Sequence, residues 1–142
     1  MLEKFADMEL QYQGETIWVP ETKLGTYIGS GTGTVTGEAL SGSVTWSLFE
    51  NQAPDVCDFT LVGTIREAGG VDGEADGSGG EQAFEILGYS EHEPDTRTWR
   101  LSAGIRFTGV KARAAFPAVG IVTGVFDSES QAHHYELFRN SP

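Results

Sequence analysis

The chain has 142 residues, 39% of them hydrophobic, with a single cysteine and a formal net charge of −12 at pH 7. This length fits one domain over residues 1–142, large enough to bury a core without disulfides or a metal. The negative charge argues against nucleic acid, whose phosphates require a basic patch, and against anionic membranes. The start lacks a signal-peptide pattern and no apolar run approaches a membrane span, so we expect a cytoplasmic protein.

Hydrophobic and polar residues alternate along the chain, as in β-strands, and helical periodicity is almost absent. The predicted strands span residues 5–12, 25–37, 41–50, 58–67, 82–91, 98–109, 119–127 and 132–139. A short extra strand could lie at Ile17 to Val19. Connections too short for crossover helices predict an antiparallel meander, either packed as a sandwich or closed on itself. We favour an all-β, eight-stranded up-and-down barrel of lipocalin-like shape, because closure removes the edge strands.

Residues 25–37, GTYIGSGTGTVTG, place glycine at every odd position except Tyr27 and Val35. Glycine weakens a strand, so a face stripped of side chains needs a reason. If the threonine-rich face meets solvent, the glycines face the barrel interior. The space is then either filled by a ring such as Trp46 or left for a ligand. A nucleotide-binding glycine loop does not fit, because a strand and not a helix follows.

Metal-binding patterns are incomplete. The segment 71–82, VDGEADGSGGEQ, begins like a calcium loop, but Ala83 stands where the closing glutamate belongs. His133 and His134 point to opposite faces of their strand, so they cannot form one ligand pair. His92 is expected to be an exposed turn residue. We therefore expect no metal and no cofactor.

Glu50 is the first acid–base candidate, since it ends the apolar face of the strand that carries Trp46. A carboxyl beside an indole has its charged form disfavoured, so Glu50 could transfer protons near neutral pH. Alternatively, Glu50 ends the strand in water. Tyr27 and Tyr135 could donate hydrogen bonds to a ligand carbonyl, or they could be packed rings with their hydroxyls at the rim.

The predicted catalytic residues are therefore Glu50, Tyr27, Tyr135 and His133. The expected walls of the ligand site are aromatic rings: Trp46, Trp99, Phe59 and Phe107.

The segments GTGTVTGEALSGSVTW, LVGTIREAGG, IRFTGVKARAAFP and GVFDSES are similar to a family of small bacterial and fungal barrels, domain of unknown function 3237. The resemblance covers about residues 24 to 138 and implies a lipocalin-like barrel that pairs as a homodimer. Trp18, beside Val19 and Pro20, could then anchor the interface.

The chain departs from the family pattern at polar positions. The family has Gly-Gly-Ala-Asp-Trp at residues 42–46 and Asp-Asp-Gly at 67–69, where this chain reads GSVTW and EAG. The family's Arg-Tyr-Ala-Trp-Leu-Asn run corresponds to residues 113–118, RAAFPA. Loss of these polar groups suggests a bulkier or more apolar ligand.

These observations predict a barrel that encloses one small, mostly apolar organic molecule. Its resemblance in shape to cyclase and isomerase barrels implies a cofactor-free isomerisation, cyclisation or related proton transfer in specialised metabolism. Catalysis would come largely from holding a reactive conformer. Two alternatives stay open: a non-catalytic carrier that uses the same lumen, and a structural or assembly module whose barrel is simply filled.

Overall fold

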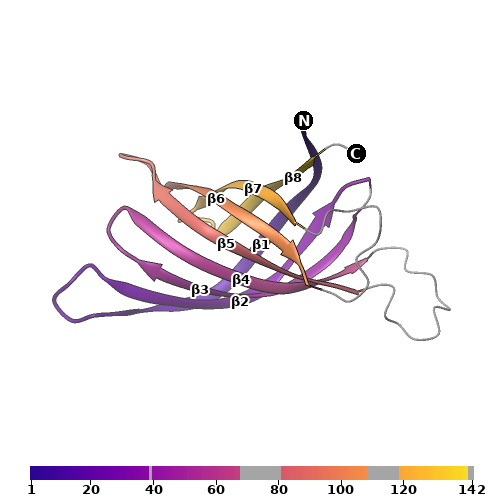
Figure 1. The fold of residues 1–142 in the computed structure, drawn as a ribbon. Helices are drawn as coiled ribbons and strands as arrows, with labels where there is room; N and C mark the ends of the chain where they lie inside the picture. Colours follow the sequence, from indigo (N-terminus) through magenta and orange to yellow (C-terminus); the bar gives the residue numbers. More distant parts are fainter. Residues whose placement is uncertain (39, 68–80, 109–118, 141–142) are drawn as a thin grey trace.

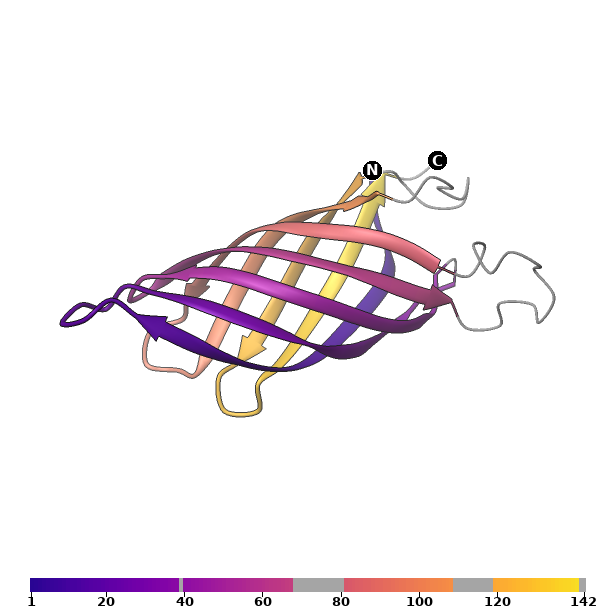
Figure 2. The ribbon, with the colours of Figure 1, turned by 90° about the horizontal axis from the view of Figure 1, so that it is seen from below.

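The computed structural model describes residues 1–38, 40–67, 81–108 and 119–140. Its eight strands are β1 (Leu2–Trp18), β2 (Gly25–Thr36), β3 (Gly42–Gln52), β4 (Val56–Glu67), β5 (Glu81–His92), β6 (Thr98–Phe107), β7 (Val119–Asp127) and β8 (Ala132–Asn140). Each strand pairs antiparallel with the next, and β8 pairs with β1, so the sheet closes into a barrel (Figure 1, Figure 2). The predicted fold class is confirmed.

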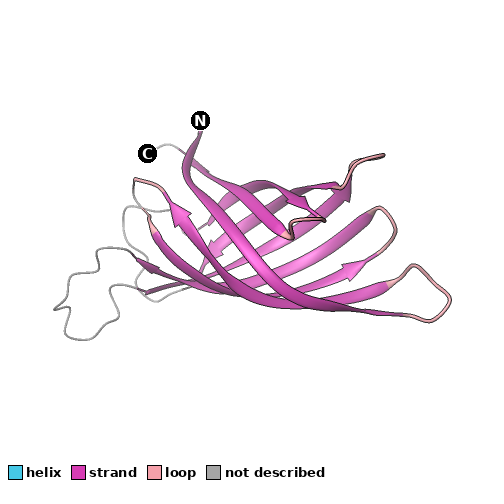
Figure 3. Cartoon of the chain, turned by 180° about the vertical axis from the view of Figure 1, so that it is seen from behind, coloured by secondary structure: helices cyan, strands magenta, loops and turns pink. Residues whose placement is uncertain are grey.

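Strands make up all the regular structure of the described residues (Figure 3). This part of the chain therefore has no helix that could span a membrane. The acidic segment 71–80 and the family-like segment 113–118 lie outside the described residues, so the predictions made for them stay predictions.

The first strand is longer than predicted. β1 continues through Gly14 to Trp18 and pairs with β2 from Asp7 to Trp18, so the proposed extra strand at Ile17 is part of β1. Gly14 resembles a loop residue in sequence, yet a Cβ built there would lie 2.4 Å from the backbone carbonyl oxygen of Ile28 and 2.5 Å from the hydroxyl of Tyr27. The glycine is thus explained by the close approach of β2, both its backbone and the Tyr27 side chain.

The bare face of β2 does turn inward. Tyr27 and Val35, which share the parity of the glycines, are 8% and 2% exposed. A Cβ at Gly29 would approach the Tyr27 ring to 2.6 Å. Trp46 pairs with Gly31, and its Nε1 donates to the Thr32 carbonyl at 3.2 Å. The rings of Tyr27 and Trp46 therefore cover much of this face. This agrees with the interpretation that aromatic rings fill the space beside the glycines.

The barrel interior has two halves along its axis, one packed with side chains and one that contains the candidate site. Towards the end that carries the chain termini, it is filled by side chains that are almost completely buried: Met8, Val44, Leu61, Ile65, Phe84, Ile86, Ile105 and Leu137. The hairpin turns β1–β2, β3–β4, β5–β6 and β7–β8 lie together at the opposite end, which we call the mouth (Figure 1, Figure 3). The packed half supplies the core, and the mouth half holds the candidate site.

Candidate functional site

A cavity of about 910 Å³ occupies the mouth half of the barrel. Volumes of this size accommodate small organic ligands in other proteins. Its apolar lining comes from Trp18, Phe59, Trp99, Leu101 and Phe126. Its polar lining includes Tyr27, Glu50, Gln52, Cys57, Ser90 and His133. Further polar side chains also line it: Glu15, Thr16, Thr22, Lys23, Asp55, His92, Ser128 and Gln131. The cavity thus combines aromatic rings with many polar and charged side chains.

Glu50 is half-buried in the cavity wall on β3, directly opposite Tyr27 on β2 and Phe59 on β4. β3 continues to Gln52, so Glu50 does not end the strand in water. Desolvation raises the pKa of the Glu50 carboxyl, and the charge of Asp58 adds to this effect. The protonated form is therefore retained to higher pH than in water.

The Cys57 thiol is buried beside Glu50. Cys57 pairs with Gln52 on β3 and with Ser90 on β5, and all three line the cavity. Hydrogen bonds from Cys57 and Gln52 to the Glu50 carboxylate partly oppose the rise in its pKa. Desolvation and the nearby Glu50 charge raise the pKa of Cys57 to about 12, so the thiol stays protonated. In this state the thiol can donate a hydrogen bond, whereas the nucleophilic form of cysteine is the thiolate.

His133 lies on β8 and is 5% exposed. Its ring packs edge-on against Phe126, with the centroids 4.5 Å apart, and its Nδ1 hydrogen bonds to the hydroxyl of Tyr135. Burial lowers the pKa of His133 to about 3, so the imidazole is neutral at physiological pH. Tyr135 is completely buried, and burial together with the Glu50 charge raises the pKa of its hydroxyl well above the usual value.

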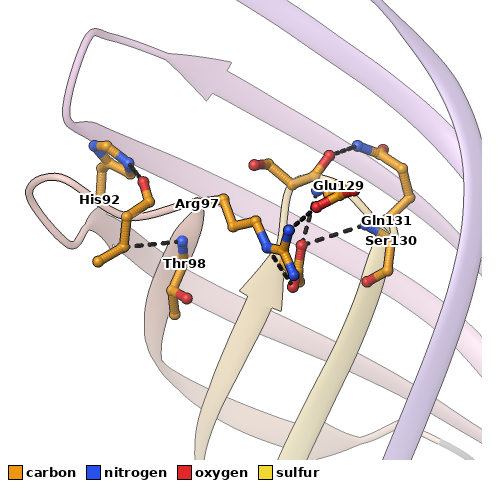
Figure 4. A network of polar contacts seen from close by, with 9 residues as sticks. His92, Arg97, Thr98, Glu129, Ser130 and Gln131 are labelled. Atoms are coloured by element: carbon orange, nitrogen blue, oxygen red, sulfur yellow. Dashed lines mark hydrogen bonds and ion pairs between the residues drawn. The ribbon is translucent and has the colours of Figure 1, made fainter.

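The rim of the mouth is held by contacts between hairpin turns. Asp127 accepts the backbone N–H groups of Glu129 and Ser130, at 2.8 and 3.3 Å, and the Nε of Arg97 at 3.2 Å (Figure 4). Arg97 also forms an ion pair with Glu129. These contacts tie the β5–β6 turn to the β7–β8 turn.

On the same rim, the ring of His92 lies 5.1 Å from that of Trp99. The Nε2 of His92 contacts the Thr96 carbonyl at 2.5 Å, which fixes the β5–β6 turn beside the cavity (Figure 4). His92 was expected in an exposed turn; it instead ends β5 and is partly buried at the cavity rim.

The structure brings five of the eight predicted site residues to this cavity: Glu50, Tyr27, His133, Phe59 and Trp99. Tyr135 is not among the residues that line the cavity, and its hydroxyl forms a hydrogen bond with His133, which does line it. Trp46 and Phe107 are buried in the barrel interior but are not among the residues that line the cavity. The catalytic and binding roles assigned to all eight stay predictions.

Sequence reasoning did not select Gln52, Cys57, Ser90 or Phe126. A signal for two of them was present: Cys57 shares the parity of Phe59, and Gln52 shares that of Glu50. Gln52 was left out because the predicted strand 41–50 ends two residues too early, and Cys57 because the predicted strand 58–67 begins two residues too late. For Ser90 and Phe126, alternation indicates the face but not the depth along the barrel axis.

Comparisons with known proteins agree on the fold. A protein of unknown function from Clostridium acetobutylicum ATCC 824 superposes with a TM-score of 0.72 at 12% identity, over 99% of both chains. An enzyme from Penicillium herquei superposes with a TM-score of 0.61 at 12% identity, over 98% of this chain and 94% of that one. No family model and no curated protein matches the chain, so its resemblance to domain of unknown function 3237 is not confirmed.

Proposed function

We propose that the protein binds one mostly apolar organic molecule in the mouth cavity and catalyses its isomerisation or cyclisation without a cofactor. The observation that carries this proposal is a half-buried carboxyl of raised pKa, Glu50, in a cavity of about 910 Å³ whose wall includes Trp18, Phe59, Trp99 and Phe126. An enzyme with the same fold is known, from Penicillium herquei. At 12% identity, that likeness supports the fold alone.

The polar groups support proton transfer better than nucleophilic attack. Glu50 can take or give a proton, whereas the Cys57 thiol and the Tyr27 hydroxyl both have pKa values raised to about 12 and stay protonated. The aromatic walls would hold an apolar substrate in one conformation and exclude water around the carboxyl.

Ligand binding is tested first, with N-phenyl-1-naphthylamine, an uncharged apolar dye whose fluorescence rises on desolvation. We expect saturable binding that is lost in Ala53→Trp, because Ala53 lines the cavity. Ser102→Trp, on the exposed face of β6, is the matched control and should bind the dye normally. Equal binding by both variants would place the dye elsewhere and oppose the proposal.

Catalysis is then tested on the compounds that co-purify with the protein, identified by mass spectrometry and screened for turnover. Glu50→Gln keeps the shape of the side chain but removes the exchangeable charge. We expect turnover to be lost and dye binding to be kept. Unchanged turnover would remove Glu50 from the mechanism, and binding without any turnover would favour the alternative of a non-catalytic carrier.

A further inference from the structure

Two inward-facing residues of β8, His133 and Tyr135, form a hydrogen-bonded pair at the wall of the cavity. They are two positions apart, so their side chains point to the same face of the strand. The hydroxyl of Tyr135 contacts Nδ1 of His133, and the two ring centroids are 5.2 Å apart. His133 lines the cavity, whereas Tyr135 is 0% exposed.

The direction of this hydrogen bond follows from the chemistry of its partners. A phenol is a stronger acid than a neutral imidazole, and an imidazole nitrogen is a better acceptor than a phenol oxygen. The favoured arrangement is therefore Tyr135 O–H donating to Nδ1. A neutral imidazole carries one proton, which then resides on Nε2. Burial supports this state, since the pKa shifts of both groups keep the imidazole neutral and the phenol protonated.

We propose that Tyr135 fixes His133 as the Nε2–H tautomer, and that this Nε2–H group donates a hydrogen bond to a carbonyl oxygen of the ligand in the cavity. The inference rests on the proposed function, whose substrate class it narrows to mostly apolar ketones and related carbonyl compounds. His133 is the binding residue, and Tyr135 is a positioning residue that acts through it.

The edge contact with Phe126 completes the arrangement. Phe126 packs against the His133 ring at an interplanar angle of 62° and lines the same cavity. Held on one side by Tyr135 and against Phe126, the imidazole has little freedom to rotate. A donor held in place in this way loses little entropy when an acceptor binds.

The tautomer is measured in the protein without a ligand, by nitrogen-15 NMR of the histidine rings. The chain has three histidines, so His92→Gln and His134→Gln assign the remaining signals to His133. We expect Nε2 to have the shift of a protonated nitrogen and Nδ1 that of a hydrogen-bonded, unprotonated one. In Tyr135→Phe the Nδ1 shift should move to the value of a nitrogen that accepts no hydrogen bond. A protonated Nδ1 in the unmodified protein would overturn the proposal.

The carbonyl preference is measured with two probes of similar shape, 2-acetonaphthone and 2-isopropenylnaphthalene, which differ by C=O against C=CH₂. In His133→Phe, the dissociation constant of the ketone divided by that of the hydrocarbon should rise by roughly 2- to 10-fold, because the variant loses one net hydrogen bond to the ketone. Tyr89→Phe, on the exposed face of β5, is the control and should leave the ratio unchanged. Comparing ratios between variants cancels the different water solubilities of the probes.

The outcomes separate this inference from the proposed function. If both probes bind and His133→Phe leaves their ratio unchanged, the cavity binds ligands but the donor role of His133 is wrong. If neither probe binds to the unmodified protein while N-phenyl-1-naphthylamine does, the assignment of carbonyl compounds is likewise wrong. If none of the three binds, ligand binding itself fails, and the carbonyl assignment fails with it.

Discussion

Burial of a neutral histidine links the candidate site to the stability of the protein at low pH. The pKa of His133 is about 3 in the folded chain, against the ordinary histidine value of 6.5 in the unfolded chain. Between these values the unfolded chain binds a proton that the folded chain excludes, so the free energy of unfolding falls as pH falls. The loss from this one group is on the order of 4 kcal/mol over that range.

We therefore expect His133→Gln to remove part of the acid sensitivity of the protein. The variant should lose less stability than the unmodified chain between pH 6.5 and 4, because glutamine does not titrate. Urea unfolding followed at several pH values measures this difference. His134→Gln is the control, since His134 is exposed and contacts Glu9 and Asp7 at the surface. Parallel pH profiles for His133→Gln and the unmodified chain would contradict the expectation.

Gly29 provides a second prediction at the scale of one residue. A Cβ there would lie 2.6 Å from a ring carbon of Tyr27, so Gly29→Ala must displace the ring that forms part of the cavity wall. Overpacking of this kind costs roughly 1–3 kcal/mol. We expect lower stability and weaker dye binding together.

Gly104→Ala is the matched control for Gly29→Ala. The nearest atom to its added Cβ is 3.7 Å away, an ordinary contact, and β-strands favour a side chain over glycine. This variant should be neutral or slightly stabilising in thermal unfolding. If the two alanines have equal effects, the close approach of Tyr27 is not the reason for the glycine at position 29.

At the scale of elements, alternation was sufficient to predict the strands and which residues of each strand share a face, but not which face lines the interior. β6 shows why: Leu101 and Ile105 are buried while Arg100 and Arg106, on the other face, are exposed. Each of these assignments depends on a period of two, which the sequence contains directly.

The ends of the strands and the depth of the site were not predictable in the same way. Gly14 interrupts the pattern of β1 for a reason that lies on β2, in the close approach of its backbone and the Tyr27 side chain. Similarly, parity shows that Trp46 and Glu50 share a face, but only the register of the closed barrel shows which of them lines the cavity. Contacts between strands, and not local preference, decide these points.

The β7–β8 hairpin turn carries a prediction at this scale. Asp127 accepts two backbone N–H groups of its own turn and one hydrogen bond from Arg97, in the β5–β6 turn. Asp127→Ala removes all three and should lower the free energy of unfolding by about 1–2 kcal/mol. Asp127→Asn keeps an oxygen for the turn and loses mainly the exposed ion pair, so it should cost about 0.5 kcal/mol.

Chemical denaturation compares the two Asp127 variants, and hydrogen exchange at residues 128–131 locates the effect. If asparagine is as costly as alanine, the ion pair and not the turn would be the main contribution of Asp127.

At the scale of the whole molecule, the negative net charge opposes self-association at low salt. We propose a homodimer in which Trp18 contacts the partner subunit. Trp18 is 53% exposed at the mouth end of β1, and Ile17, Val19 and Leu24 beside it are also about half exposed. An apolar cluster of this kind is typical of interaction surfaces.

Two copies that each carry a net charge of −12 repel one another, and salt shortens the range of this repulsion from about 10 Å at 0.1 M to about 3 Å at 1 M. We therefore expect the dimer to become tighter as salt rises, which is the opposite of an interface held by ion pairs. Sedimentation velocity across a salt series measures the dissociation constant. Trp18→Ser should weaken the dimer at every salt concentration, whereas Phe49→Ser, equally exposed but on the barrel wall, should not. A monomer at micromolar concentration in high salt would exclude the dimer, and a weakening by Phe49→Ser instead would move the interface to the outer face of the barrel.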